Sequence, residues 1–113
     1  MARSRAGLLR RLAHLAAFAV PGTLVEVHLR CGTASCGCHR DPDRRHGPHG
    51  YLKFRDPEGR ATALYVPRAS AREAQQAVRA WRELGPTLGA LGQLNRQALR
   101  ARLRRRPDAA AGR

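Results

Sequence analysis

Aromatic residues, acidic residues and long apolar runs are all scarce in this 113-residue chain. Phe, Trp and Tyr make up 4% of it, which excludes a hydrophobic core filled by large aromatic rings. A bound metal would help to stabilise such a fold, because its binding free energy adds to the folding free energy. The apolar segment 15–20 is much shorter than the ~20 residues of a membrane-spanning helix, and too short for the apolar region of a secretory signal. We therefore expect a cytoplasmic protein with no membrane partner.

The shortage of acidic residues leaves a large positive charge. Eight Asp and Glu oppose 22 Lys and Arg, which gives a formal net charge of +14 at pH 7. Lys53 is the only lysine, and a GC-rich coding bias explains the preference for arginine but not the surplus of cations. That surplus indicates a polyanionic partner, and we expect nucleic acid, with DNA favoured over RNA.

Cysteine is also sparse, and its pattern excludes a disulfide framework. Cys31, Cys36 and Cys38 lie within eight residues, and an odd number this closely spaced is typical of reduced thiols in the cytoplasm. Three thiols followed by histidines indicate a metal site, because Zn²⁺ takes four thiolate or imidazole ligands in a tetrahedron. We expect Gly32 and Gly37 to let the backbone wrap around the ion through positive φ.

The predicted ligands of this structural zinc site are Cys31, Cys36, Cys38 and His46. His46 is preferred as the fourth ligand because the seven residues after Cys38 allow the loop to return. His39 is adjacent to Cys38 and would be strained there, and His49 is the other alternative. Four protein ligands would close the site, which predicts a structural and not a catalytic role.

The remaining residues do not predict catalysis. The chain has no Gly-rich phosphate loop, no H-E-x-x-H helix and no G-x-S-x-G elbow, and its acidic residues show no paired arrangement. We therefore expect a protein that is not an enzyme. The alternative is a redox or hydrolytic cysteine enzyme, which a low thiol pKa at Cys36 or Cys38 would favour.

Hydrophobic periodicity predicts an α+β fold. Leucines at spacings of three and four predict a helix over residues 5–18, and alternation predicts a strand over residues 23–30. Residues 31–50, which include the Cys/His knuckle at 31–49, should be irregular. Two further strands, 51–55 and 61–66, are separated by turn residues and predict a β-hairpin.

A long C-terminal helix is predicted from Ser70 onward, because apolar residues again recur at spacings of three and four. Gly85-Pro86 interrupts this pattern, and either kinks the helix or splits it in two. Residues 1–106 would form a single small domain, and residues 107–113 a disordered tail.

The predicted nucleic-acid contacts are basic residues of the hairpin and of the helix end, namely Lys53, Arg55, Arg60, Arg104, Arg105 and Arg106. Contacts of this kind reach phosphates and carry no base information, so we expect weak sequence preference. Few aromatic residues are available for base stacking, so duplex should bind at least as well as single strands. The alternative function is a protein-interaction or assembly module, in which the long helix binds a partner protein or a second copy and zinc is structural only.

Several short segments are distinctive. They are Gly22 to Val25, Arg30-Cys31-Gly32, Cys36-Gly37-Cys38, His46-Gly47-Pro48, Tyr51-Leu52, Gly59-Arg60 and Tyr65-Val66-Pro67. Over roughly residues 20–100 they resemble a family of small bacterial proteins classed as a domain of unknown function, whose members often occur near transposase genes. The resemblance implies a metal knuckle leading into a hairpin and a long helix, and an association with mobile elements. Similarity to the small DNA-binding domains of integrases is by fold analogy only.

Overall fold

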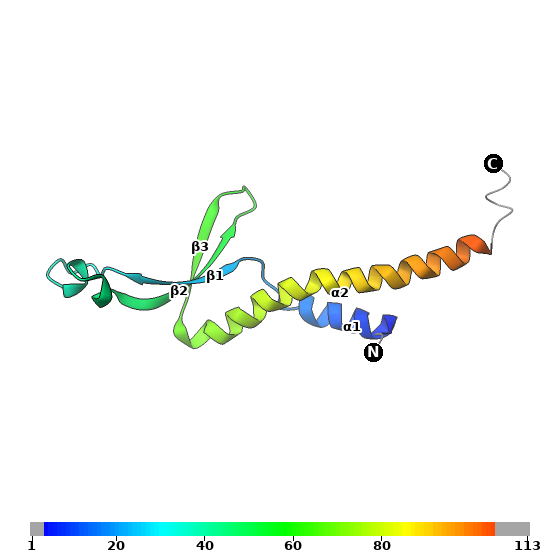
Figure 1. Ribbon diagram of the computed structural model, residues 1–113, viewed down its shortest axis with the longest axis horizontal. Coiled ribbons are helices and arrows are strands. Elements are labelled where there is room, and N and C mark those ends of the chain that lie inside the picture. The colour runs from blue at the N-terminus through cyan, green and yellow to red at the C-terminus, as the bar shows by residue number, and fades with distance from the viewer. Residues whose placement is uncertain (1–3, 106–113) are drawn as a thin grey trace. The chain divides into compact units, whose positions relative to one another are not determined.

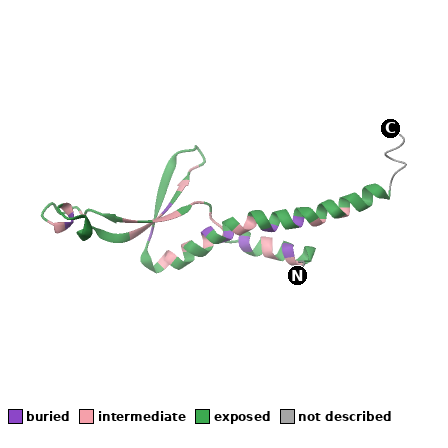
Figure 2. Ribbon diagram, in the orientation of Figure 1, coloured by how far each residue is buried: buried purple, intermediate pink, exposed green. Residues whose placement is uncertain are grey.

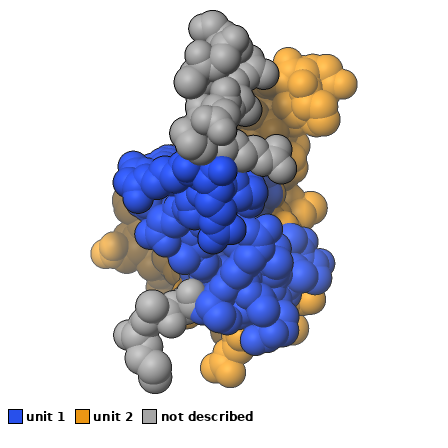
Figure 3. Space-filling model, turned by 90° about the vertical axis from the view of Figure 1, so that its right-hand side faces the viewer, with its two compact units in different colours: residues 1–18, 81–113 blue, residues 19–80 orange. Residues whose placement is uncertain are grey.

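The computed structural model describes residues 4–105 of the chain, which fall into two compact units (Figure 1; Figure 3). The sheet unit comprises residues 19–80, and the helical unit comprises residues 4–18 and 81–105. The tail predicted over residues 107–113 lies outside the described residues. None of the described helices is long and apolar enough to cross a membrane.

Helix α1, Arg5–Ala16, begins at a capping serine. The Ser4 hydroxyl accepts a hydrogen bond of 3.0 Å from a backbone N–H of the first turn, which satisfies a donor that the helix leaves free. Leu8 and Leu15 are buried on one face. The helix ends two residues before the predicted boundary, because the Phe18 N–H bonds only three residues back and closes a turn.

Helix α2, Ala71–Arg104, continues through Pro86 as one helix (Figure 1). Of the two predicted outcomes at Gly85-Pro86, the split into two helices is therefore wrong. Pro86 has no N–H to bond the carbonyl of Arg82, but Gly85 has no Cβ to clash with the proline ring, so a helical conformation before proline is tolerated. The first ten residues of α2 belong to the sheet unit and the rest to the helical unit.

The sheet unit is built on three antiparallel strands in the order β1-β2-β3. They are β1 Thr23–Leu29, β2 His46–Arg55 and β3 Ala61–Val66. Together with α1 and α2 they confirm the predicted α+β fold class. Residues 46–50 belong to β2, so the prediction that they are irregular is wrong: pairing with β1 outweighs the low strand propensity of glycine and proline there.

The inner face of the sheet carries the hydrophobic core of this unit. Leu52 and Val66 are buried together with Val78 of α2. Partly buried residues pack around them, namely Val20, Leu24, Phe54 and Ala74. Side chains alternate along a strand, so Lys53 and Arg55 point to the outer face. Figure 2 shows that most positions of the hairpin and of the C-terminal part of α2 remain exposed.

Candidate metal centre

The Cys/His knuckle lies between β1 and β2 and contains two short 3-10 helices, Gly37–His39 and Pro42–Arg44. Its two ends meet because the strands that flank it are antiparallel: Leu29 at the end of β1 pairs with His46 at the start of β2. Cys31 follows Leu29 by two residues. The sheet itself therefore brings the first and the last predicted ligand together.

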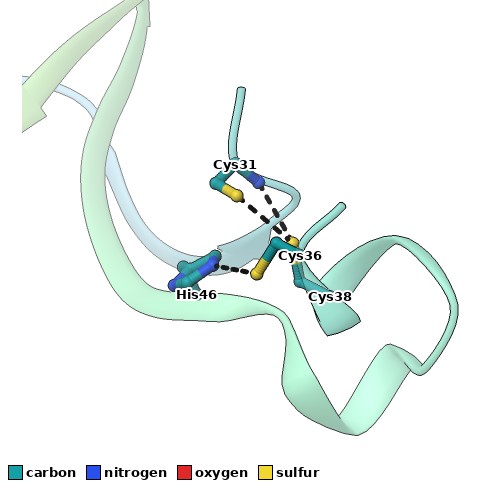
Figure 4. Close-up of side chains that lie close together, drawn as sticks. All are labelled: Cys31, Cys36, Cys38 and His46. Carbon is teal, nitrogen blue, oxygen red and sulfur yellow. Dashed lines mark hydrogen bonds between the residues drawn. The ribbon is translucent and has the colours of Figure 1, made fainter. Parts of the chain in front are cut away.

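The four predicted ligands converge at one point in the knuckle (Figure 4). The Sγ atoms of Cys31 and Cys38 are 3.6 Å apart, and Cys36 Sγ lies 3.3 Å from His46 Nε2. All four ligand atoms lie within 4.8 Å of one another. A tetrahedral ion with bonds of ~2.0–2.3 Å separates its ligands by ~3.3–3.8 Å, so the cluster has the size of a metal site and could hold an ion.

The sulfur atoms differ in their electrostatic environment. A hydrogen bond from the Cys38 backbone, and next the His46 side chain, lower the pKa of Cys36 to about 6. The buried Cys38 accepts a hydrogen bond of 3.3 Å from the Cys31 N–H, which lowers its pKa, but desolvation and the neighbouring thiols outweigh this bond and raise the pKa of Cys38. The lowered pKa of Cys36 is the feature named above as favouring a cysteine enzyme, but a thiolate at this position is equally what a metal ion requires of a ligand. The positive charge of an ion would also favour deprotonation of Cys38.

Of the three histidines considered as fourth ligand, the structure brings only His46 into the cluster. His39 Nε2 donates a hydrogen bond of 2.8 Å to the carbonyl oxygen of Cys31, so its ring supports the backbone of a ligand instead. His49 lies further along β2, opposite Val27. The register between β1 and β2 therefore determines which histidine is the fourth ligand of the cluster.

Gly47, directly after His46, has a structural role that the ligand spacing did not reveal. Its φ is +139°, and a Cβ atom there would lie 2.7 Å from the carbonyl oxygen of Val27 and 3.2 Å from the Cα of His28. Only glycine fits so close to β1, and this approach holds His46 beside the cysteines. The sequence signal was a glycine adjacent to a predicted ligand.

The roles predicted for Gly32 and Gly37 are wrong. Among the described residues, the glycines with positive φ are Gly22, Gly47 and Gly59. Gly37 instead begins the first 3-10 helix, which turns the chain with negative φ angles. The backbone wraps around the cluster through these short helices.

The predicted nucleic-acid residues of the hairpin fall into two groups. Lys53 and Arg55 are exposed on the outer sheet face, although Arg55 also donates a hydrogen bond of 2.8 Å to the Gly59 carbonyl. Arg60 pairs with Asp56 at 3.0 Å and with Glu58 at 3.5 Å. The charge of Arg60 is therefore balanced within the turn.

The predicted contacts at the helix end are only partly described. Arg104 is the last residue of α2 and Arg105 follows it, and both are exposed. Arg106 lies outside the described residues.

An aromatic pair on the outer sheet face was not predicted. Tyr51 and Tyr65 pair directly across β2 and β3, with ring centroids 5.7 Å apart in an edge-to-face arrangement. Tyr65 is 54% exposed, and Lys53 lies on the same face two residues from Tyr51. The alternation of side chains along each strand could have placed each tyrosine on one face of the sheet. Only the register between β2 and β3 shows that the two rings are in contact.

Comparison with known proteins gives one match. No curated protein and no solved structure matches the chain. A family described as a domain of unknown function, DUF6788, matches residues 1–76, which is more than half of the chain and includes the whole sheet and all four residues of the cluster. The chain therefore belongs to the DUF6788 family.

Proposed function

We propose that this protein is a small zinc-binding protein that binds nucleic acid, DNA in preference to RNA, and carries out no chemistry of its own. The observation that carries the proposal is the outer sheet face, where Lys53 and Arg55 accompany the exposed Tyr65 and its half-buried partner Tyr51. Cations of this kind bind phosphates, and exposed rings stack on bases. The resemblance to proteins found near transposase genes supports a mobile element as the setting.

Zinc is the metal that the donor set favours. Three thiolates and one imidazole are soft or borderline ligands, which suit Zn²⁺ and not Mg²⁺ or Ca²⁺. The four residues Cys31, Cys36, Cys38 and His46 would supply the four ligands that a tetrahedral zinc ion takes. A complete set leaves no position for substrate or water, which supports a structural role and a protein that is not an enzyme.

The distribution of charge supports a polyanionic partner. The described part of the helical unit contains nine arginines and one acidic residue, Glu83, which pairs with Arg11. The sheet unit contains ten basic and six acidic residues. Arginines lie along the C-terminal part of α2 at positions 82, 96, 100, 102 and 104. A helix with this charge attracts phosphates whatever the base sequence.

The test is the salt dependence of binding to a short DNA duplex, measured by fluorescence anisotropy. For each phosphate neutralised, log K should fall by about 0.9 per tenfold rise in salt. Replacing Arg104 and Arg105 by glutamine should flatten that slope and weaken binding to all sequences alike.

A matched pair of single variants separates specific contacts from total charge. Lys53→Gln and Arg60→Gln remove the same charge, but Arg60 is already paired with Asp56 and Glu58. Lys53→Gln should therefore reduce the salt slope more. Absence of binding to duplex and single strands at tens of micromolar would overturn the nucleic-acid proposal, since ordinary non-specific binders reach ~10⁻⁴–10⁻⁶ M. It would favour the protein-interaction alternative.

A further inference from the structure

The part of α2 in the helical unit carries an exposed apolar stripe that the proposed zinc and nucleic-acid binding does not use. Its members are Trp81, Leu88, Leu99 and Leu103, exposed by 49%, 59%, 47% and 64%. Their spacings of seven, eleven and four residues place all four on one face of an α-helix. Large apolar residues aligned in this way are typical of an interaction surface.

The α2 stripe is distinct from the face that contacts α1. Glu83 and Asn95 contact α1 through Arg11 and Arg5, respectively. Between them, at intervals of four residues, Thr87 and Leu91 are buried. This row of four residues is therefore the side of α2 that α1 covers, and the α2 stripe lies beside it.

Two glycines open the surface between the large side chains. Gly85 follows Trp81 by four residues and Gly92 follows Leu88 by four, so both lie on the face of the α2 stripe. A Cβ atom at either position would meet nothing within 4 Å. The side chains of a partner helix can enter these gaps and pack against the α2 backbone.

The charge beside the stripe decides what kind of partner fits. Arg82, Arg96 and Arg100 follow one edge of the stripe, at spacings of fourteen and four residues. Glu83, the one acidic residue in the described part of this unit, is paired with Arg11. A second copy of the chain would place arginines against arginines, whereas an acidic partner would complement them.

We propose that the α2 stripe docks an acidic amphipathic helix of another protein. Leucine-like residues of that helix would contact Leu88, Leu99 and Leu103, and its carboxylates would pair with the arginines beside them. Trp81 provides the large amphipathic side chain that interfaces of this kind use as an anchor. The proposal is independent of zinc, but it shares Arg82, Arg96 and Arg100 with the proposed nucleic-acid contacts.

Trp81 is the only tryptophan of the chain, so its fluorescence reports directly on the stripe. The probe is a synthetic peptide of about four heptads, with leucine at the core positions, glutamate elsewhere and no tryptophan. Titrated into the full chain, it should shift Trp81 emission to shorter wavelength and saturate. A peptide with lysine in place of glutamate should not bind, and a peptide with serine in place of leucine should bind at least about tenfold more weakly.

Variants locate the binding site. Leu88→Gln and Leu99→Gln should each weaken binding about tenfold, and circular dichroism would show that the exposed substitutions leave the helices folded. Leu64→Gln, at a 56% exposed position of β3, is the matched control and should bind as the parent does. Equal binding of the leucine and serine peptides would overturn the proposal, because charge alone would then suffice. No emission change, or a change on raising the concentration of the protein alone, would also overturn it, the latter in favour of a second copy.

Discussion

Removal of the proposed zinc ion should unfold the knuckle, because few buried side chains hold this segment together. Cys38 is the only buried residue between Arg30 and Gly50, and the hydrophobic cluster around Leu52 and Val66 contains no knuckle residue. A segment without an apolar core depends on its ion, since binding free energy becomes folding free energy. Cys38→Ser should therefore abolish high-affinity metal binding and loosen the ends of β1 and β2.

The size of the effect follows from linkage. With free zinc at about 1,000 times its dissociation constant, binding adds ~4 kcal/mol to the stability of the folded state. For a unit of this length ~1 kcal/mol corresponds to roughly 4–8 °C in melting temperature, so chelation should lower the Tm by about 20 °C. His39→Ala is the matched control: it removes one hydrogen bond to Cys31, worth ~1 kcal/mol, and should leave the metal content unchanged.

The assay combines metal analysis of purified protein with thermal melts before and after chelation. We expect about one zinc per chain, and a Co²⁺ derivative whose absorption shows tetrahedral thiolate ligation. Identical melts with and without chelator, or a Cys38→Ser variant that retains its zinc, would refute the reasoning. Loss of metal in His39→Ala and not in His46→Ala would mean that the wrong histidine has been assigned.

Three further predictions concern single side chains. Gly47→Ala should destabilise the sheet unit by about 1–3 kcal/mol in denaturant titrations and weaken metal binding, because its Cβ would meet Val27, whereas Gly32→Ala should be nearly neutral. Tyr65→Leu should weaken single-strand DNA binding by about 1–3 kcal/mol while duplex affinity stays unchanged, and equal loss on both would exclude base stacking. Asp56 accepts hydrogen bonds from the Arg60 N–H, from the Arg60 side chain and from the Glu58 N–H, which hold the pKa of its carboxyl below the usual range. The turn should therefore lose stability as the pH falls through that lowered pKa, and amide exchange in Asp56→Asn should lack this acid dependence.

The residues of the candidate metal site could be predicted from sequence because donor chemistry is local. Three reduced cysteines within eight residues are typical of a metal site, and a returning loop restricts the histidine. Choosing between His46, His39 and His49 was harder, since it depends on the pairing of Leu29 with His46 across two strands. The register between β1 and β2 is a long-range property of the fold. The close approach of Gly47 to β1, where its φ is positive, depends on that register.

Secondary structure was predictable where periodicity is strong. Helix α1, strand β3 and most of α2 follow from leucine spacing and alternation. The prediction failed at residues 46–50, where Gly47, Pro48 and Gly50 resemble a loop but pair with β1. Local propensity is a weak guide wherever a neighbouring strand supplies the missing hydrogen bonds.

The composition predicts the net charge but does not show which basic side chains are unpaired and available to bind phosphate. Lys53 and Arg60 look equivalent in the sequence, yet Arg60 is balanced by Asp56 and Glu58 while Lys53 faces solvent. The formal net charge of the sequence also omits the charge of a metal-filled cluster. Three thiolates and a neutral imidazole around a divalent ion carry a net charge of −1. A zinc-filled cluster would therefore not attract phosphate by itself. Its contribution to the proposed binding would be to hold the ends of β1 and β2 in register, so that the cations and rings of the outer sheet face keep a fixed spacing.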